Sequence, residues 1–500
     1  MPESQKSSYD IQPYPRLPFA QSHPDRLATM GRVFGLNPPD IRNCRVLEMG
    51  CATGGNLIPM ADQLPGAHFV GFDLSQRQVN EANEWIVELD LKNLEIVQLD
   101  IANAHNQLGD FDYIVCHGVY SWVPVAIQDL ILEFVAKHLN PNGIAYISYN
   151  TKPGWCVRGM VRDMMRFHVQ GIDNATDKLS QARRWLNYLV QSVSPNDPYG
   201  AMLKKELDSL SGKSEEYLLH EYFEDQNHPV YFHEFAVSLA SRKLRHLSEA
   251  DVESTFHFDL PKEVLRTLEQ FSGDEVRLEQ HVDFLRNRTY RQSLICHADQ
   301  RVHRALEPAI VDRFFLESQL LPTLSTLHFR NRFNGITLAI DDPVLHSSLS
   351  ILAELNRSDW RFKELVDEVA RRTKLAIDQE KLQRMLLQAF ASGHLAFHTV
   401  PPRYSYDLSG MPIASRCARS QSRQGTHVTS LSHHNVVLPD LDRLVLQTLD
   451  GETRIVDLAF KVLALIKERK IVSIDSGKLQ EAIDVSVKNL ARMRLLLAAD

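Results

Sequence analysis

The sequence of 500 residues lacks any arrangement of cysteines that would indicate a disulfide framework or a zinc site. Its six cysteines are scattered and include no C-x-x-C pair: Cys44, Cys51, Cys116, Cys156, Cys296 and Cys417. No unbroken apolar run approaches the roughly 18 residues of a membrane-spanning helix, and the first residues, MPESQKSSYD, contain no apolar core of a signal peptide. These absences predict a cytoplasmic protein with reduced thiols.

An excess of positive charge is also missing. Lys and Arg number 55 against 63 Asp and Glu, which gives a formal net charge of −8 and an isoelectric point near 6.2. Proteins that bind nucleic acids usually need basic residues to neutralise phosphates, so a DNA or RNA partner is not expected. The hydrophobic fraction of 44% is ordinary for a globular protein, and the length predicts about two to four domains.

Between residues 45 and 150, segments typical of strands alternate with segments typical of helices. The expected strands are RVLEMG, HFVGFDLS, LEIVQLDI, FDYIVCHG and GIAYISYN. The expected helices between them are NLIPMADQL, QVNEANEWIVEL and VAIQDLILEFVAKHL. This alternation predicts an α/β fold of the Rossmann-like type, in which a doubly wound parallel sheet carries helices on both faces.

Residues 1–40 precede this sheet and are rich in proline and aromatic residues. Ser22 or His23 can cap a short helix there. We consider two interpretations of this extension: a lid over a bound cofactor, with Tyr9, Tyr14 and His23 as candidates, or a strap packed against the sheet.

After residue 150 the pattern becomes almost entirely helical, which predicts a helical insertion at about residues 155–225. A helix and a short strand are expected in FHEFAVSLASRKLRHLSEAD, and another strand in DFLRNRTYRQSLICHAD. If these two strands are antiparallel edge strands of the sheet, one domain spans residues 41–300 and contains the insertion.

The remaining chain is expected to contain two similar helical blocks. We expect a connecting helical segment at residues 301–345 and a first winged-helix-like block at residues 346–400. A linker at residues 401–436 and a second helical or winged-helix-like block at residues 437–500 are expected to follow. The first block has the helix-helix-helix-strand order of a winged helix. Because its Lys and Arg barely outnumber its Asp and Glu, contact with protein is favoured over contact with phosphates.

The turn EMGCATGGN at residues 48–56 follows the first expected strand and fits two cofactors. Counted as Gly50-x-Ala52-x-x-Gly55, it matches the dinucleotide pattern in its G/A variant. Counted as Gly50-x-Ala52-x-Gly54 after Glu48, it is similar to the loop that binds S-adenosylmethionine (SAM), with one glycine replaced.

The charges around this turn favour SAM. Asp73, at the end of the second strand, suits the ribose of either cofactor and does not discriminate. Glu48, two residues before the first glycine, favours the positively charged methionine moiety of SAM, because a carboxylate there would repel the pyrophosphate of a dinucleotide. A nicotinamide dehydrogenase is therefore the least favoured interpretation.

Five segments in order resemble the motifs of class I SAM-dependent methyltransferases: VLEMGCATG, GFDLS, LDI, FDYIVCHGVYSWVP and LNPNGIAYIS. In that family the acid after the third strand contacts the adenine amino group and its neighbour lies against the ring. The cofactor-binding residues that the resemblance implies are Glu48, Gly50, Cys51, Ala52, Gly54, Asn56, Asp73, Leu74, Asp100, Ile101 and His117. Ala52 replaces a usual glycine, which is tolerable if its φ is negative.

The wider chain resembles bacterial methyltransferases with a methyltransferase regulatory region, including rickettsial-type protein lysine methyltransferases with a C-terminal winged helix. The segments SYNTKPGW, YLLHEYFEDQNHPVYFHEF and DFLRNRTYRQSLICHA carry this resemblance. It implies a protein substrate, such as a surface or secreted protein before export. It also suggests that the insertion and the winged-helix blocks form a docking groove and the interface of a homodimer.

A lysine acceptor must lose a proton before methyl transfer, and burial among aromatic groups promotes this loss. Aromatic faces also attract ammonium and sulfonium cations. The candidates at the carboxyl ends of the expected strands and in the following segments are Tyr120, Trp122, Tyr149, Asn150, Trp155, Tyr231 and His233. Core anchoring is the alternative role for Trp122 and Trp155, and hydrogen bonding alone is the alternative for His117.

The expected function is therefore a SAM-dependent N-methyltransferase that modifies lysine side chains of a protein. Two alternatives remain: a SAM-dependent methyltransferase of a small molecule, with purely structural C-terminal blocks, and a SAM-sensing winged-helix regulator. A metal is not expected, because the His-rich segment HEYFEDQNHPVYFHE lacks the H-E-x-x-H spacing.

Overall fold

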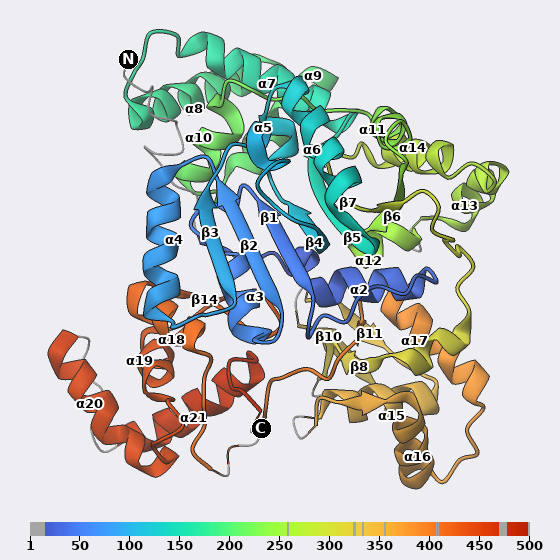
Figure 1. Cartoon of the computed structure of the whole chain (residues 1–500), viewed down its shortest axis with the longest axis vertical. Coiled ribbons are helices and arrows are strands. Elements are labelled where there is room, and N and C mark those ends of the chain that lie inside the picture. The colour runs from blue at the N-terminus through green and yellow to red at the C-terminus, as the bar shows by residue number, and fades with distance from the viewer. Residues whose placement is uncertain are drawn as a thin grey trace.

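A seven-stranded sheet forms the centre of the computed structural model (Figure 1), with the strand order β3-β2-β1-β4-β5-β7-β6. The structure describes residues 16–257, 260–323, 327–332, 335–354, 357–406, 408, 410–469 and 478–498. The strands are β1 (Arg45–Met49), β2 (His68–Asp73), β3 (Leu94–Gln98), β4 (Phe111–Cys116), β5 (Leu139–Asn150), β6 (Leu244–Glu249) and β7 (Tyr290–His297). The predicted Rossmann-like α/β fold is thereby confirmed.

Of the two strands expected to be antiparallel, β7 agrees with the prediction and β6 departs from it. Strands β1 to β5 are mutually parallel, and β7 is antiparallel to both of its neighbours, β5 and β6. Consequently β6 runs in the direction of β5, and only β7 is reversed. The long helical connection after β5 explains this, because a crossover of that length returns the chain to start a parallel strand.

Alternate residues of the central strands point into two separate cores. Val46 packs with α2 (Pro24–Val33), α3 (Leu57–Gln63) and α4 (Gln76–Glu88) on one face. Leu47 packs with α5 (Ile101–Ala104), α6 (Val125–His138) and α11 (Phe232–Ala240) on the other. This period of two is the expected consequence of strand geometry.

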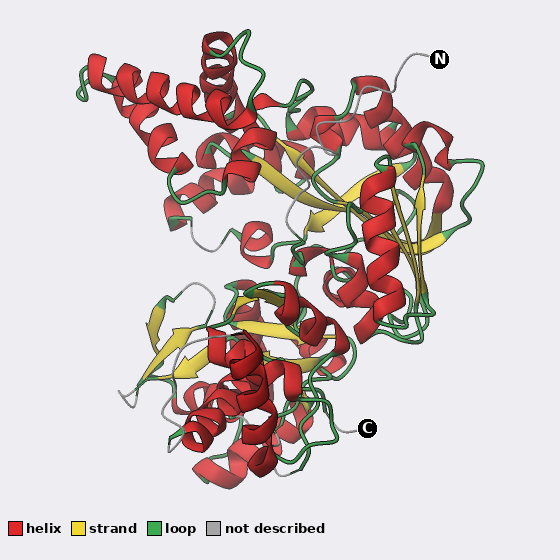
Figure 2. Cartoon of the chain, turned by 90° about the vertical axis from the view of Figure 1, so that its left-hand side faces the viewer, coloured by secondary structure: helices red, strands yellow, loops and turns green. Residues whose placement is uncertain are grey.

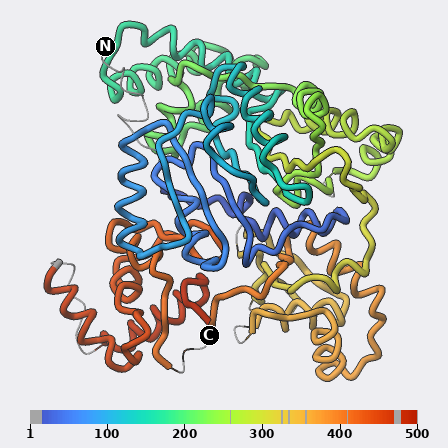
Figure 3. Tube along the Cα trace, in the orientation of Figure 1, coloured from blue at the N-terminus to red at the C-terminus, as the bar shows by residue number. Residues whose placement is uncertain are grey.

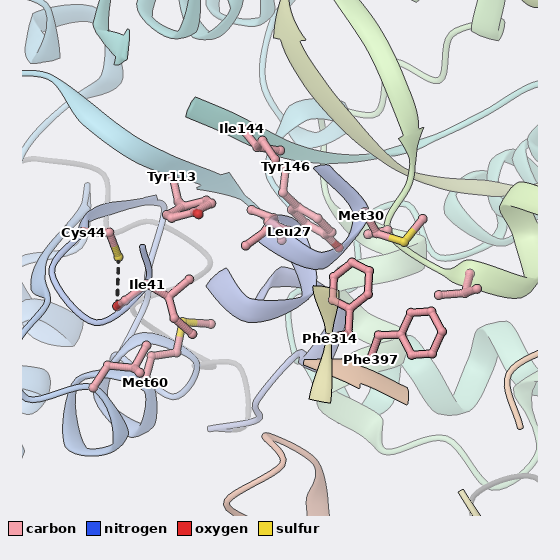
Figure 4. Close-up of a cluster of buried hydrophobic side chains, with 14 of the residues drawn as sticks. Leu27, Met30, Ile41, Cys44, Met60, Tyr113, Ile144, Tyr146, Phe314 and Phe397 are labelled. Carbon is pink, nitrogen blue, oxygen red and sulfur yellow. Dashed lines mark hydrogen bonds between the residues drawn. The ribbon is translucent and has the colours of Figure 1, made fainter. Parts of the chain in front are cut away.

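The N-terminal helix α2 joins the sheet to the C-terminal part of the chain. Figure 4 shows Leu27 and Met30 of α2 between Tyr146 of β5 and a second group that contains Phe314 and Phe397. Leu27 and Met30 are fully buried. His23 caps α2 by accepting a hydrogen bond from the Asp25 backbone, as the sequence predicts.

Four helices occupy the predicted insertion: α7 (Gly154–His168), α8 (Ala175–Ser192), α9 (Pro198–Leu210) and α10 (Glu215–Phe223). They bury their own apolar cluster, which includes Val161, Leu179 and Leu203. Figures 1 and 2 show the insertion and the C-terminal helices at opposite ends of the molecule. None of the helices in the described ranges is both long and apolar enough to cross a membrane.

Downstream of the insertion, helices lie in the chain between strands β6 and β7. They are α12 (Val252–Phe256), α13 (Lys262–Leu268) and α14 (Glu275–Arg286). The buried Arg291 of β7 forms ion pairs with Glu249 of β6 and with Glu279 and Asp283 of α14. These pairs tie β7 to β6 and to α14.

Residues 301–345, expected to be helical, contain short strands joined by loops and the 3-10 helix η4 (Pro308–Arg313). They contain β8 (Phe315–Ser318), β9 (Leu320–Pro322), β10 (His328–Asn331) and β11 (Thr337–Ala339). Strand β8 pairs with β12 (Trp360–Arg361) and β13 (Leu395–His398). Because these partners are distant in sequence, a local pattern could not reveal the pairing.

The first C-terminal block has the predicted order of helices followed by a strand. Its helices are α15 (Pro343–Ala353), α16 (Phe362–Thr373) and α17 (Gln379–Ala391), and β13 follows them. Its core joins the core of the sheet through α2.

Residues 401–436, expected to be a linker, contain α18 (Arg416–Gln424) and a hairpin of β14 (His427–Thr429) and β15 (Asn435–Val437). The helices α19 (Asp440–Thr448), α20 (Leu458–Arg469) and α21 (Leu479–Arg492) follow and share a core with α18. Figure 3 traces the chain as it crosses from the first block to this second one. The polar composition of the segment concealed its structure, because α18 and the hairpin are stabilised by packing on other elements.

Candidate cofactor and acceptor site

The glycine-rich turn between β1 and α3 needs glycine for two reasons. Gly50 and Gly54 have φ values of +67° and +74°, in the left-handed region that favours glycine. A Cβ added to Gly50 would lie 2.6 Å from Cγ2 of Val119, and one added to Gly55 would lie 2.7 Å from Cα of Arg16. The turn is therefore closely approached by the loop after β4 and by the N-terminal extension.

Ala52 does not have the negative φ at which an alanine would be tolerated without strain. Its φ is +49°, not negative, so a residue with a Cβ occupies the left-handed region. The Ala52 backbone N–H donates to Oδ2 of Asp73 at 2.9 Å, and the Ser75 backbone N–H donates to Oδ1 at 2.9 Å. The Asp73 carboxylate thus stabilises both this strained turn and the turn after β2.

Glu48 is a buried carboxyl group at the centre of the site, with 3% of its surface exposed. Its Oε1 accepts a hydrogen bond from Nδ2 of Asn56 at 2.7 Å, whereas Oε2 is buried without a hydrogen-bond partner among the described residues. Burial raises the pKa of Glu48 to about 8; the Asn56 hydrogen bond opposes this shift and the charge of Asp73 adds to it. A buried, unpartnered oxygen of this kind suits a cationic ligand.

The predicted adenosine-binding residues follow the neighbouring strands β2 and β3. Leu74 is 62% exposed, directly after Asp73, and its carbonyl accepts from Nε2 of Gln98. Asp100 is exposed, and its Oδ1 accepts from the backbone N–H of Ala102 as the cap of α5. Ile101 packs partly against the core. Glu48, Asp73 and Asp100 thus belong to the carboxyl ends of three adjacent strands, where ligands of such sheets bind.

His117, after β4, is enclosed by aromatic groups. Its ring stacks on Phe19 with centroids 3.6 Å apart, and its Nδ1 lies 2.8 Å from the hydroxyl of Tyr146. Burial lowers the pKa of His117 to about 3, so the imidazole is neutral. Phe19 comes from the N-terminal extension, which therefore covers this end of the sheet; Tyr9 and Tyr14 lie outside the described residues.

Asn56, at the end of the turn, has partners from distant parts of the chain. Its Oδ1 lies 2.9 Å from the backbone N of Phe19 and 2.8 Å from Nε2 of His433, and its Nδ2 donates to Oγ of Ser22 at 3.0 Å. Phe19, Ser22 and His433 are site residues that the sequence analysis missed. No local signal points to them, because their relation to the turn is purely tertiary.

The predicted acceptor residues fall into two groups. Tyr120 and Tyr149 are 4% and 1% exposed, and both rings pack against Phe235 in the core. The hydroxyl of Tyr149 lies 3.1 Å from Oγ of Ser293, and burial raises its pKa. These two tyrosines are therefore core residues next to the site.

The second group gathers around the end of β5. Trp122 and Trp155 meet edge to face at 6.1 Å. The backbone N–H of Val230 donates to the carbonyl of Asn150, which brings the neighbouring Tyr231 to this strand end. The side-chain Nδ2 of Asn150 is buried and has no partner in the described structure.

The ring of Tyr231 stacks with His233 at 5.4 Å, and Nζ of Lys152 lies 5.3 Å from the Tyr231 ring centroid. Nδ1 of His233 in turn contacts Oε1 of Gln280 at 2.9 Å. Tyr231 and His233 thus form an aromatic wall near the end of β5, and this wall already contacts one ammonium group of the chain itself, that of Lys152. Within the described ranges, no group of three or more His, Cys, Asp or Glu side chains could hold a metal ion.

Three family models match the chain. A methyltransferase domain matches residues 47–145, a predicted methyltransferase regulatory domain matches 214–297, and a PKMT C-terminal winged helix domain matches 410–493. The last match begins at residue 410, within residues 401–436, which were expected to be a linker. This agrees with the helix α18 and the hairpin found in that segment.

Two proteins of Rickettsia prowazekii are similar in sequence. The uncharacterized protein RP789 is 32% identical over 461 residues, which cover 89% of this chain and 83% of that protein. The uncharacterized protein RP028 is 42% identical over 234 residues, which cover 47% of this chain and 94% of that protein. The structure of PKMT2 from Rickettsia typhi, also solved in complex with AdoHcy, has a TM-score of 0.88 and 28% identity over 97% of this chain and 100% of that one.

The strand order with its single reversed strand, and the glycine turn with three carboxylates at neighbouring strand ends, define a class I methyltransferase. More narrowly, the chain belongs to the family of RP789. In this chain the methyltransferase domain is followed by a predicted methyltransferase regulatory domain and a PKMT C-terminal winged helix domain. It is a SAM-dependent methyltransferase of the PKMT type.

Proposed function

We propose that this enzyme transfers the methyl group of SAM to the Nζ atom of lysine side chains in another protein. The observation that carries the proposal is the aromatic wall beside the end of β5, where Tyr231 already faces the ammonium of Lys152 at 5.3 Å. A wall that attracts this ammonium can receive that of a substrate lysine. The full-length likeness to PKMT2 supports the same substrate class.

In this proposal Glu48, Asp73 and Asp100 each contact a different part of the cofactor. Glu48, held by Asn56, faces the cationic methionine end, because its Oε2 is buried and unpartnered. Asp73 accepts from the ribose hydroxyls while it fixes the turn through Ala52. Asp100 and Ile101 flank the adenine. The bound cofactor supplies an activated methyl group, and the protein supplies position and desolvation.

The acceptor amine is prepared by its surroundings. Among Trp122, Trp155 and Tyr231 an ammonium loses hydration, which favours the neutral amine that can attack a methyl group. The buried amide of Asn150 orients the acceptor from the end of β5. Tyr120 and Tyr149 hold this edge in place from the core.

We assign the docking of the substrate protein to the helical insertion, because α7 begins at Gly154, close to Lys152, which contacts Tyr231. The winged-helix region (residues 410–493) lies at the opposite end of the molecule from the insertion (Figure 1). A surface or secreted protein before export remains the predicted substrate. A homodimer also remains a prediction, which light scattering tests.

The test is incubation with labelled SAM and a cell lysate, followed by mass spectrometry of the labelled proteins. We expect methylated lysines. Tyr231→Ala should abolish transfer but leave AdoHcy affinity unchanged, and Tyr231→Phe, which keeps the aromatic face, should retain most of the activity. Label that enters only small molecules or RNA would contradict the lysine proposal. Cofactor binding without any transfer would favour a SAM-sensing regulator.

A further inference from the structure

His433 of the winged-helix region contacts Asn56 in the glycine-rich turn of residues 50–56, called the cofactor turn below. His433 lies between β14 and β15, and its Nε2 is 2.8 Å from Oδ1 of Asn56, which is 377 positions away in the chain. The imidazole is buried, with 2% of the residue exposed. Asn56 also donates to Oε1 of Glu48, so one side chain, that of Asn56, links His433 to this carboxyl group.

The hydrogen bonds of Asn56 determine which atom carries the proton. The backbone N–H of Phe19 can only donate, so the atom of Asn56 that it meets is the acceptor oxygen Oδ1. The amide nitrogen Nδ2 therefore donates to Glu48 and Ser22. His433 must then donate from Nε2, which leaves its buried Nδ1 as a bare acceptor. Burial lowers the pKa of His433, which agrees with a neutral ring.

The backbone of His433 has an unusual, left-handed conformation. His433 has a φ of +58°, which few residues with a Cβ adopt. The turn is held by hydrogen bonds from the His433 backbone N–H to the Ser430 carbonyl and from the Leu431 N–H to the Arg494 carbonyl. Its surroundings thus impose a costly geometry that places the imidazole against Asn56.

Contacts with α3 and α4 fix the region on either side of the turn. Nε2 of Gln63 donates to the Ser430 carbonyl at 3.2 Å, and the Asp62 carboxylate pairs with Arg416 at 3.3 Å. Nε1 of Trp85 donates to Oγ of Ser420 at 3.0 Å. The hairpin therefore has a defined position relative to the cofactor turn.

We propose that His433 is a positioning residue, through which the winged-helix region holds Asn56, and thereby Glu48, in the geometry that receives the methionine end of the cofactor. This inference rests on the proposed cofactor site. Asn56 loses a donor to its oxygen when His433 is absent, so its amide can turn away and release Oε1 of Glu48. We expect the effect at the methionine end, because Asp73 accepts from Ala52 and Ser75 and Asp100 accepts from Ala102, whereas Glu48 accepts from Asn56.

The test compares two ligands on the full-length protein. His433→Asn tolerates the left-handed backbone but is too short to reach Asn56. We expect it to weaken AdoHcy binding by about tenfold, the effect of one lost hydrogen bond in a buried site. The affinity for 5′-methylthioadenosine, which lacks the amino-acid end, should be unchanged. The KM for SAM should rise with little change in kcat.

Two further variants complete the design. His433→Gln, which can still donate from a longer side chain, should recover most of the AdoHcy affinity. His427→Asn, an exposed histidine in the same hairpin, should behave as wild type. Equal losses for both ligands, or no loss for either, would overturn the role of His433. A wild-type protein that binds neither ligand would instead overturn the proposed cofactor site itself.

Discussion

At the scale of single residues, Glu48 couples cofactor binding to protonation. Its pKa, raised to about 8 by burial, means that the carboxyl is mostly protonated at pH 7 in the free protein. A cation beside Oε2 favours the ionised form, so binding of AdoHcy or SAM at pH 7 should release about one proton per site. Calorimetry in buffers of different ionisation enthalpy measures this number, and the affinity should rise as the pH approaches about 8.

Glu48→Gln provides the control, since it copies the neutral carboxyl and keeps the acceptor for Asn56. Proton release should vanish in this variant and AdoHcy should bind at least about tenfold more weakly, while the thermal midpoint at pH 7 changes little. Proton release that persists in Glu48→Gln would place the titrating group elsewhere.

Ala52 offers a second test at this scale, because its φ of +49° is unfavourable for any residue with a Cβ. Ala52→Gly should raise the free energy of unfolding by about 0.5–1 kcal/mol, the relief of left-handed strain less the greater entropy of an unfolded glycine. Ala61→Gly, the same change within helix α3, should lower it by about 1 kcal/mol or more. Chemical denaturation measures both; a destabilised Ala52→Gly would mean that the strain is absent.

The turn shows what a sequence can and cannot reveal about a site. Glu48 and Asp73 could be predicted because each sits at a fixed offset from a strand end, and strand ends meet at one edge of a parallel sheet. The φ of Ala52 could not, since it depends on the hydrogen bond to Asp73 across two elements. His433 could not either, because only tertiary structure brings it to Asn56.

At the scale of elements, α2 is joined to the C-terminal part of the chain by a buried ionic group. Nδ1 of His398 in β13 lies 2.8 Å from Asp25 of α2, and its Nε2 lies 3.0 Å from Glu317 of β8. Burial alone would lower the pKa of His398, but hydrogen bonds and charges of the two carboxylates outweigh it and raise the pKa to about 9. This histidine is therefore charged at neutral pH.

The raised pKa determines how stability depends on pH. The contribution of His398 is complete below the unfolded value of 6.5 and is lost as the pH rises through about 9. We expect the thermal midpoint of the wild type to fall over this interval, and the fall to be clearly smaller in His398→Gln. The matched control is His168→Gln, an exposed histidine of α7. Identical pH profiles of wild type and His398→Gln would exclude this role.

Elements with a strong local signal agree with their prediction, and those defined by distant partners do not. The five parallel strands and the helices of the insertion follow from local periodicity. The direction of β6 and the strands in residues 301–345 depend on which segment lies beside them. Pairing of this kind is decided by the assembled fold.

At the scale of the whole molecule, the cofactor turn is contacted by both the N-terminal extension and the winged-helix region. AdoHcy should therefore slow hydrogen exchange in the hairpin of β14 and β15 as well as in residues 50–56. Helix α20, which takes no part in these contacts, serves as the internal reference. Protection confined to residues 50–56 would show that the hairpin does not sense the ligand.

The meeting of distant residues at Asn56 also has a consequence in time. Phe19, Ser22 and Glu48 are synthesised before Asn56, but His433 follows it by 377 positions. A nascent chain can thus contain all seven strands of the sheet before His433, which donates to the side-chain amide of Asn56, has been synthesised. The hydrogen bond from His433 to Asn56 can therefore form only after the hairpin of β14 and β15 has been synthesised.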